Sequence, residues 1–419
     1  MKIHISGAVL AVTVALSAQS ATGFGQSASQ DWPQWRGQAR TGELTAAQTP
    51  AAWPTKWQPR WRVEVGEGYA SPVTSDGRLF VHSRRDPAEV VTALDASSGK
   101  MLWQQSYDSA FTKNQYAAAM AKGPNATPLV SGGRLFTFGV TGILTAWDAG
   151  TGKQLWRKDF SSLIDSSKLF CGTAASPILA HGLVVVQVGS DVKGGQIVAL
   201  DPATGQAKWT WTGPGPGYAS PMLVDIAGVS QLVTMTNGSV IGIDARNGAG
   251  LWTVPFPDEW HENIVTPVWT GKHLVVSGTR QGTHGYTIAK TGETWTSTQA
   301  WKNDTVGMYM SSPVLGGGTL FGLSARRKGQ FVAMDAATGA IKWTSTGRDA
   351  DHASVLLTPA HVIYLTSTGE LLVVKRSATA FESERQYEVA ASATYAMPLF
   401  VGGDLIVRDA TGVSRLGGS

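Results

Sequence analysis

One spaced pattern recurs along this chain and constrains its fold more than any other feature. The pattern is an apolar residue, an Asp, three residues, a Gly, three residues and a Trp. Its five complete copies are Asp95–Gly99–Trp103, Asp148–Gly152–Trp156, Asp201–Gly205–Trp209, Asp244–Gly248–Trp252 and Asp335–Gly339–Trp343, and a shorter copy without the Asp has Ile288, Gly292 and Trp295. Successive Trp residues are 43–53 residues apart. A period of roughly 40–50 residues is typical of β-propeller blades.

Each residue type in this pattern has a physical role in a hairpin. An Asp at the end of a strand can accept hydrogen bonds from backbone N–H groups two residues on, which starts a turn. The Gly supplies the positive φ that such a turn needs. The Trp lies on the next strand, where its large apolar area can pack against the neighbouring blade. We therefore expect these Trp residues to hold the blades together and not to stack on a ligand.

A second element opens each unit with small residues and, in most copies, a Pro. The eight openings are Ala70-Ser71-Pro72, Ala126-Thr127-Pro128, Ala175-Ser176-Pro177, Ala219-Ser220-Pro221, Val265-Thr266-Pro267, Ser311-Ser312-Pro313, Ala353-Ser354-Val355 and Ala396-Met397-Pro398. Small residues suit the crowded inner strands around a propeller axis, and Pro is tolerated at the first residue of a strand. Eight openings predict an all-β, eight-bladed propeller of four-stranded antiparallel blades, with almost no helix.

The last unit indicates how the ring closes. The seventh unit has Tyr387 where a Trp is expected, and the eighth ends before it can form an outer strand. The segment around Trp61, which precedes the first opening, resembles such a Trp strand. We expect this N-terminal strand to complete the last blade, because closure removes open sheet edges that invite aggregation.

Composition agrees with this fold and excludes several others. Charged residues make up 15% of the chain, and it contains 49 Gly and 16 Trp, which argues against coiled coils, helical repeats and acidic disorder. The net charge of +4 comes from 34 basic and 30 acidic residues without a long block of either sign, so it predicts no nucleic-acid partner. A single cysteine, Cys171, excludes an internal disulfide.

The N-terminus predicts export. Lys2 and His4 precede an apolar run from Ile5 to Ala18, and small residues follow it. This is the pattern of a signal peptide, and the run is too short for a membrane span of about 20 residues. We expect a signal peptide at residues 1–25, a lead-in segment at 26–56 and a single propeller domain at 57–419. We expect the mature protein to be periplasmic or secreted and monomeric, without a transmembrane segment or lipid anchor.

The Asp–Gly–Trp turns resemble the pyrroloquinoline-quinone-like β-propeller repeat. The segment Asp31-Trp32-Pro33-Gln34-Trp35-Arg36-Gly37 is similar to the first motif of exported bacterial members of that superfamily. The resemblance covers roughly residues 31–419. It includes two branches, the quinoprotein alcohol and glucose dehydrogenases and cofactor-free propellers such as the outer-membrane assembly lipoprotein BamB. Fold alone does not choose between their functions.

The dehydrogenase branch implies a quinone, a bound Ca²⁺, an Asp base, a Trp floor and commonly a disulfide of adjacent cysteines. Cys171 cannot form that disulfide, and no Ca²⁺ ligand can be assigned residue by residue. No His or Cys pair has the spacing of a zinc site. We therefore expect no cofactor, with pyrroloquinoline quinone and calcium as the alternative, and we assign no catalytic, cofactor-binding or metal-binding residue.

The loops before the openings are the candidate binding residues, because they feed the innermost strands and should ring one mouth of the axial channel. Aromatic and polar groups that converge in a funnel predict a binding site. The candidates are Tyr69, Asn125, Tyr218, His261, Glu262, Asn263, Tyr309, Asp351, His352 and Tyr395. Within this set, the sequence His261-Glu262-Asn263 could ligate a metal or hold a polar ligand.

Three functions remain open from the sequence. The first is an exported, non-catalytic binding or scaffold protein of the bacterial cell envelope, which holds a protein partner or polymer on its loops. The second is an oxidoreductase that uses a quinone and Ca²⁺ on alcohols or sugars. The third is a propeller that binds or cleaves saccharides, for which cleavage would need paired carboxylates across a funnel.

Overall fold

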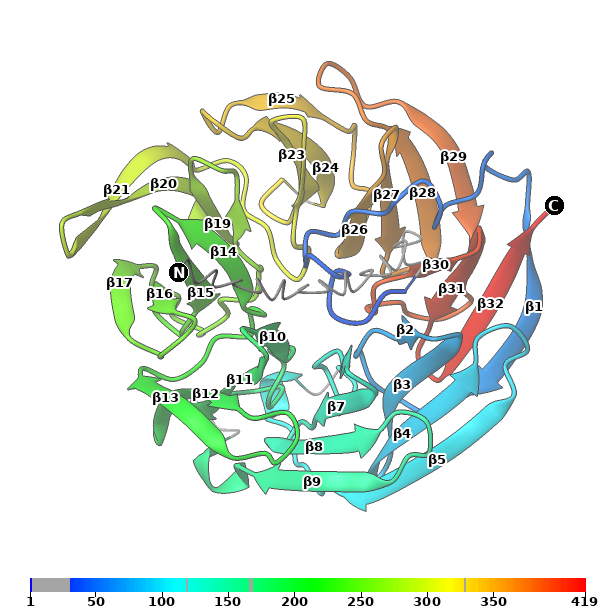
Figure 1. Ribbon diagram of the computed structural model, residues 1–419. Coiled ribbons are helices and arrows are strands. Elements are labelled where there is room, and N and C mark those ends of the chain that lie inside the picture. The colour runs from blue at the N-terminus through cyan, green and yellow to red at the C-terminus, as the bar shows by residue number, and fades with distance from the viewer. Residues whose placement is uncertain (2–30, 118–119, 166–168, 328) are drawn as a thin grey trace.

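The computed structural model describes Met1 and residues 31–117, 120–165, 169–327 and 329–419. These residues form eight four-stranded antiparallel sheets arranged in a ring (Figure 1). Two short 3-10 turns, η1 (Gln115–Ala117) and η2 (Ser161–Leu163), are the only helical elements among the described residues. The predicted eight-bladed propeller is therefore confirmed. The predicted signal peptide lies outside the described residues, apart from Met1.

We number the blades in chain order, and the strands of each blade run outward from the axis. Blade 1 contains β2 (Val73–Ser75), β3 (Arg78–Arg85), β4 (Ala88–Asp95) and β5 (Met101–Asp108); blade 2 contains β6 (Leu129–Ser131), β7 (Arg134–Phe138), β8 (Ile143–Asp148) and β9 (Gln154–Asp159); blade 3 contains β10 (Ile178–Ala180), β11 (Leu183–Ser190), β12 (Gly194–Leu200) and β13 (Ala207–Gly213); and blade 4 contains β14 (Met222–Ile226), β15 (Val229–Met235), β16 (Ser239–Asp244) and β17 (Gly250–Pro255).

The second half of the ring repeats this arrangement. Blade 5 contains β18 (Val268–Trp269), β19 (Leu274–Gly278), β20 (Gly282–Thr291) and β21 (Thr294–Asn303); blade 6 contains β22 (Val314–Gly316), β23 (Thr319–Ser324), β24 (Gln330–Asp335) and β25 (Ile341–Thr344); blade 7 contains β26 (Ala353–Leu357), β27 (His361–Thr366), β28 (Glu370–Lys375) and β29 (Ser383–Glu388); and blade 8 contains β30 (Leu399–Val401), β31 (Asp404–Arg408), β32 (Gly412–Gly418) and β1 (Trp57–Glu64).

The ring closes through its two ends, as the sequence predicts. Strand β1 pairs antiparallel with β32, with Trp61 opposite Arg415 and Val63 opposite Val413. Figure 1 shows β1 in blue beside β32 in red. The outer edge of the last blade is thereby made by the first strand, which leaves no unpaired gap between blades 8 and 1.

The Asp–Gly–Trp turns have the predicted geometry. In blade 1, Asp95 Oδ1 accepts hydrogen bonds from the backbone N–H groups of Ser97 at 3.1 Å and Ser98 at 2.8 Å. Gly99 has a φ of +73°. A Cβ on Gly99 would lie 2.7 Å from the ring of Trp61, which comes from blade 8. The turn Gly is thus required both for its backbone conformation and for the close approach of the preceding blade's Trp.

This Trp-on-Gly contact passes from blade to blade. Trp103 covers Gly152, Trp156 covers Gly205, and Trp209 covers Gly248, each with ring atoms 2.5–2.7 Å from a Cβ built on the Gly. Several of the indole N–H groups also donate to a carbonyl of the covered turn, as Trp103 does to Ala149 at 3.1 Å and Trp156 does to Pro202 at 3.0 Å. The contacts of Trp103 and Trp156 therefore join apolar burial to a directed hydrogen bond.

Blade 5 differs from the prediction. Gly292 has a φ of +59°, but nothing lies within 4 Å of its Cβ position, so Trp252 of blade 4 does not cover it and Trp295 does not belong to a regular copy of the turn. The contact to blade 6 is made by Trp301, whose ring lies 2.2 Å from a Cβ built on Gly339. The reason is that the β20–β21 hairpin is longer than the other hairpins, so its turn lies away from the neighbouring blade. The Trp that packs on the next blade therefore lies six residues further along β21, at position 301 and not 295.

Near the axis, side-chain hydroxyl groups of the openings connect the blades. The backbone N–H of Ser71 donates to Thr127 Oγ1 at 3.1 Å, that of Thr127 to Ser176 Oγ at 3.0 Å, and that of Ser176 to Ser220 Oγ at 2.9 Å. The N–H of Met397 in blade 8 donates to Ser71 Oγ at 2.8 Å. The sequence accounts for the residues of the openings by their small size. The structure shows a second role, because their hydroxyl groups accept hydrogen bonds from buried N–H groups of the adjacent blade.

The lead-in segment crosses the far end of the inner strands. The carbonyl of Trp32 accepts a hydrogen bond from Thr74 N in blade 1 at 3.0 Å, and the N–H of Trp32 donates to Thr74 Oγ1 at 2.8 Å. The carbonyl of Pro33 accepts from Val130 N in blade 2 at 2.8 Å, and Leu44 N donates to the Leu357 carbonyl in blade 7 at 2.7 Å. Because these contacts reach blades on different sides of the ring, the lead-in segment lies across the channel.

We predict that Gly152→Ala destabilises the protein more than Gly182→Ala. Both glycines have nearly the same positive φ, +75° and +76°, but a Cβ at Gly152 would meet Trp103, whereas nothing lies within 4 Å at Gly182. The shared backbone strain costs about 1–2 kcal/mol, and the clash should add roughly 1–3 kcal/mol for Gly152→Ala alone. Urea unfolding of both variants measures the difference, and equal losses would contradict the packing role of the turn Gly.

Removal of residues 57–66 should open the ring. The deletion leaves β32 without its partner and removes the Trp61 contact with Gly99. We expect a lower melting temperature together with self-association, because the exposed edge of β32 can pair with another chain. Thermal unfolding and size-exclusion chromatography measure both effects. A truncated protein that melts at the wild-type temperature and stays monomeric would contradict closure through β1.

Candidate functional site

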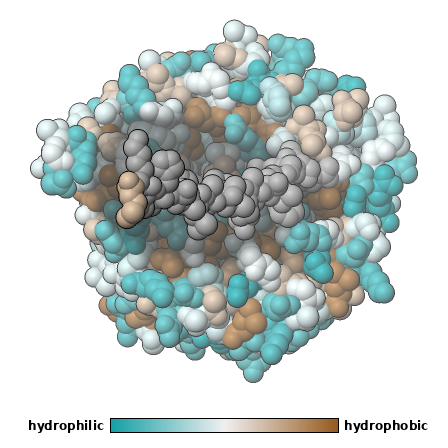
Figure 2. All heavy atoms as spheres, in the orientation of Figure 1, coloured by the Kyte–Doolittle hydropathy of each residue, from teal (hydrophilic) through white to brown (hydrophobic). Residues whose placement is uncertain are grey.

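The residues immediately before the eight openings all line one cavity, which we call the mouth cavity. It has a volume of about 350 Å³. The eight equivalent residues are Tyr69, Asn125, Ala174, Tyr218, Ile264, Met310, His352 and Tyr395. They meet because the eight inner strands start around one axis, so the same repeat position of every blade faces the same space. Figure 2 shows hydrophobic residues gathered around the central hollow of the ring on the face that it draws.

Aromatic rings from four consecutive blades form a curved wall in this cavity. The ring centroids of Tyr69 and Tyr395 are 4.4 Å apart, and those of Tyr395 and His352 are 5.6 Å apart. Tyr309 continues the wall at 5.6 Å from His352. Each ring is tilted by 45° from the next, which is one eighth of a full turn. The wall therefore follows the rotation between successive blades.

The carboxylate in the mouth cavity is Glu262, and protein groups hold both of its oxygens. The Tyr309 hydroxyl donates to Glu262 Oε1 at 2.8 Å. Arg280 Nη2 lies 3.2 Å from Glu262 Oε2 and 2.8 Å from Asp258 Oδ1. Glu262 is thus held in place by its neighbours, and it shares the positive charge of Arg280 with Asp258.

Burial shifts the pKa of several side chains that line the cavity toward their neutral forms. It raises the pKa of the Tyr69 and Tyr218 hydroxyls. The pKa of Tyr309 is also raised, first by burial and then by the negative charge of Glu262. Burial lowers the pKa of His352, so its imidazole stays neutral at pH 7. The cavity presents neutral rings with polar tips, which suits a partly apolar ligand.

The floor and one side of the cavity are formed by residues that the sequence does not predict. Trp35 of the lead-in segment lies at the inner end, where its indole N–H is 3.4 Å from Thr266 Oγ1. Tyr116 and Phe170 line another side, with ring centroids 5.8 Å apart. These two come from the long connections between blades 1 and 2 and between blades 2 and 3. They have no counterpart in the repeat, so no periodic signal could find them.

Cys171 also lies in this side wall and is inert by its surroundings. Its carbonyl accepts a hydrogen bond from Asn125 Nδ2 at 3.0 Å, and its N–H donates to the Tyr218 hydroxyl at 3.4 Å. Burial raises the pKa of its thiol to about 11. Only a small fraction is therefore the reactive thiolate at neutral pH.

Seven of the ten candidate residues line the mouth cavity, and three lie outside it. His261 Nδ1 lies 2.8 Å from Asp191 Oδ2. Asn263 is buried, and its amide donates to the carbonyls of Thr236 and Phe256 at 2.9 and 3.0 Å. Asp351 pairs with Arg348 and lines an adjoining hollow. The residues of the His261-Glu262-Asn263 segment thus point to different partners, and no group of three His, Cys, Asp or Glu within the described ranges could hold a metal ion.

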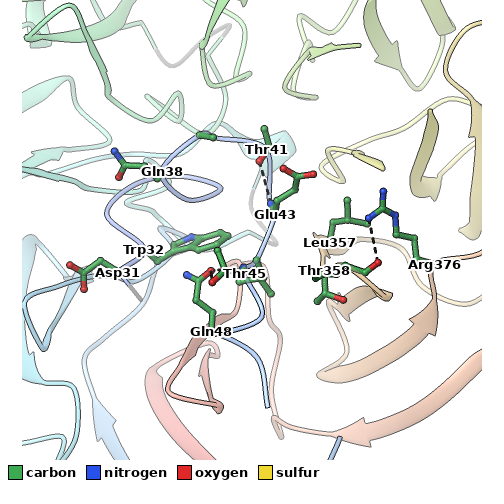
Figure 3. A pocket seen from close by; sticks show the side chains of 13 residues that line it. Asp31, Trp32, Gln38, Thr41, Glu43, Thr45, Gln48, Leu357, Thr358 and Arg376 are labelled. Carbon is green, nitrogen blue, oxygen red and sulfur yellow. Dashed lines mark hydrogen bonds between the residues drawn. The ribbon is translucent and has the colours of Figure 1, made fainter. Parts of the chain in front are cut away.

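A second hollow of about 490 Å³ lies on the lead-in side of the ring. Figure 3 shows Thr41, Glu43 and Gln48 of the lead-in segment on one side and Leu357, Thr358 and Arg376 of blade 7 on the other. The Glu43 N–H donates to Thr41 Oγ1 at 3.3 Å. This hollow follows from the path of the lead-in segment, and none of the ten candidate residues lines it.

The mouth cavity does not fit a quinone with three carboxylates and a Ca²⁺ ion. Among the described residues that line it, none is Arg or Lys, so the carboxylates would have no counter-charge. A Ca²⁺ ion takes six to eight oxygen ligands, whereas Glu262 is already bound by Tyr309 and Arg280.

Similarity to known proteins agrees with the fold and spans two kinds of relative. The chain is 26% identical over 216 residues to the outer membrane protein assembly factor BamB of Yersinia pestis, which covers 51% of this chain and 49% of that protein. It is 35% identical over 148 residues to the 1-butanol dehydrogenase (cytochrome c) of Thauera butanivorans, which covers 35% of this chain and 20% of that protein. The matches therefore span about half or less of these relatives.

A solved structure shows the same fold over nearly the whole chain. The quinohemoprotein alcohol dehydrogenase of Comamonas testosteroni superposes with a TM-score of 0.70 at 15% identity, over 93% of this chain and 81% of that chain. Within the described residues, no helix is long and apolar enough to cross a membrane. A family profile described as "Outer membrane protein assembly factor BamB" matches residues 39–230, 87–345 and 236–380. Because these matches cover most of the propeller, the chain belongs to that family of pyrroloquinoline-quinone-like β-propellers.

Proposed function

We propose that this protein is an exported, non-catalytic binding propeller of the bacterial cell envelope, which holds a protein partner at its mouth cavity. The observation that carries the proposal is the convergence of aromatic side chains from equivalent positions of several blades on one small cavity. Relatives named as outer membrane protein assembly factors add support.

The chemistry of the cavity favours binding over catalysis. A nucleophile needs a nearby base to activate it. Among the described residues that line the cavity, no hydrogen bond joins Cys171 or a serine hydroxyl to His352 or Glu262. Cys171 is held as a thiol, and Glu262 is held by Arg280 and Tyr309. These groups shape and stiffen the cavity.

The rim favours a protein as the partner. Tyr116 is 69% exposed and Trp260 is 44% exposed, although both are large aromatic residues. Their ring centroids are 6.1 Å apart, and Tyr116 also contacts Phe170 inside the cavity. Tyr and Trp are enriched at the centres of protein interfaces. A cavity of about 350 Å³ lies at the low end of ligand pockets, so it suits one or two side chains of a partner better than a polymer.

The dehydrogenase alternative has two observations in its favour. Trp35 lies where the dehydrogenase branch implies a Trp floor, and a quinohemoprotein alcohol dehydrogenase shares the fold. The lack of a lining cation among the described residues argues against a quinone with three carboxylates. A saccharide could also bind to the aromatic wall, and the experiment below distinguishes a saccharide ligand from a protein partner.

A photo-crosslinking experiment tests the proposal. A photoreactive phenylalanine derivative in place of Tyr116 should give one discrete protein adduct in the producing cells. The same group at Leu155, which is 42% exposed on the outer strand β9, is the matched control and should give none. A combined Tyr218→Ala and His352→Ala change should reduce the Tyr116 adduct at least tenfold, because both side chains line the cavity.

Three outcomes would contradict the proposal. Equal adducts from both positions would mean nonspecific contact. An adduct that survives the two substitutions in a variant with wild-type circular dichroism would place the partner elsewhere. An adduct that glycosidases degrade and proteases do not would identify a saccharide as the ligand.

Cys171 should react slowly and only at high pH if it has no catalytic role. With a pKa of about 11, about 0.1% of the thiol is thiolate at pH 8, since only the thiolate reacts. The rate of alkylation by iodoacetamide should therefore rise about tenfold per pH unit between pH 8 and 10. A rate that levels off below pH 8 would reveal an activated thiol and contradict the non-catalytic assignment.

A further inference from the structure

Two arginines of the lead-in segment are buried in the centre of the ring. Arg36 is 2% exposed and Arg40 is 6% exposed. Arg36 Nη2 donates to the carbonyls of Pro313 in blade 6 and Thr41, at 2.6 and 2.8 Å. Arg40 Nη1 donates to the carbonyl of Pro177 in blade 3 at 2.8 Å. The two guanidinium groups thus reach across the axis to blades that are three positions apart.

Part of each guanidinium group lacks a partner. Arg36 Nε, Arg36 Nη1 and Arg40 Nε are buried and face no acceptor among the described residues. The acceptors that the two groups do have are neutral carbonyl or amide oxygens. Two other buried arginines differ in this respect. Arg84 lies 3.5 Å from Glu89, and the charge of Asp409 partly offsets the effect of burial on the pKa of Arg408.

Both groups nevertheless remain charged at neutral pH. Burial lowers the pKa of Arg36 to about 10. Burial, together with the positive charge of Arg36, lowers the pKa of Arg40 to about 9. Two buried like charges without a counter-charge are costly, because each has lost its hydration and they repel each other. The described part of the chain supplies no carboxylate to offset them.

We propose that a small monovalent anion of the chloride class binds on the channel axis, beside the unpartnered N–H groups of Arg36 and Arg40. Guanidinium N–H groups form strong, charge-assisted hydrogen bonds with anions. Neither arginine lines the mouth cavity or the hollow on the lead-in side, so the proposed anion site is distinct from both.

The anion would fix the lead-in segment inside the ring. Trp35 directly precedes Arg36 and provides the floor of the mouth cavity. Neutralising the two arginines therefore stabilises both the lead-in segment across the channel and the floor of the cavity. This inference does not depend on the proposed function, because neither arginine lines the mouth cavity.

Crystals of the full mature protein grown with sodium bromide test the site directly. An anomalous bromide peak within hydrogen-bond distance of Arg36 and Arg40 is the expected result. Water alone at that position, with bromide peaks only on the outer surface, would overturn the proposal.

Halide-dependent stability is the second test. At constant ionic strength, replacing gluconate by chloride up to 150 mM should raise the melting temperature by roughly 2–4 °C, since an ion that binds only the native state stabilises it. Arg40→Gln should abolish this rise. Arg408→Gln is the matched control. Arg408 is 1% exposed and donates to the carbonyls of Ala70, His82 and Glu67, so its loss should lower stability and retain the chloride effect.

Two results of the melting-temperature measurements would also overturn the proposal. One is a wild-type melting temperature that is equal in chloride and gluconate. The other is a chloride effect that persists in Arg40→Gln. If Arg40→Gln does not fold, the wild-type chloride series and the bromide crystals still decide the question.

Discussion

The contact of a Trp ring with the turn Gly of the next blade is the interaction on which the rest of this ring depends. It needs a Gly because the turn has a positive φ and because a Cβ would overlap the indole ring, as at Gly152 beneath Trp103. Closer to the axis, hydroxyl groups of the openings accept the backbone N–H of the adjacent blade, as Thr127 does from Ser71. Each blade is therefore fixed to its neighbour at two radii, which sets both the spacing and the rotation between blades.

Because the blades are rotated regularly around the axis, residues at one position of the repeat come together and form the surface of the mouth cavity. The residue before each opening lies at the same height in every blade, so eight side chains that are far apart in sequence become neighbours. The aromatic wall of Tyr69, Tyr395 and His352 follows directly, with 45° between successive rings. Because these residues are not the ones that hold the blades together, they can vary without loss of the fold. Relatives that share the fold can thus be named for outer membrane assembly or for alcohol oxidation.

The sequence was sufficient to predict those parts of the structure that the repeat itself determines. The number of blades, closure through Trp61 and the convergence of Tyr69, Tyr218 and Tyr395 all depend on local turns and equal spacing. It was insufficient where a residue is placed by a contact outside the repeat. Trp301 replaces Trp295 because the β20–β21 hairpin is longer than its counterparts. Trp35 forms the cavity floor only because the lead-in segment crosses the channel, and His261 is drawn away by Asp191.

Titration of the purified protein with pyrroloquinoline quinone and Ca²⁺, followed by calorimetry and by absorbance, tests most directly whether this propeller binds a partner or performs redox chemistry. A mouth cavity without lining cations among the described residues, and with Glu262 held by Arg280 and Tyr309, should show no saturable heat and no new absorbance band. Alcohol-dependent dye reduction should likewise be absent. Stoichiometric binding of the quinone with dye reduction that increases with alcohol concentration would contradict a non-catalytic binding propeller.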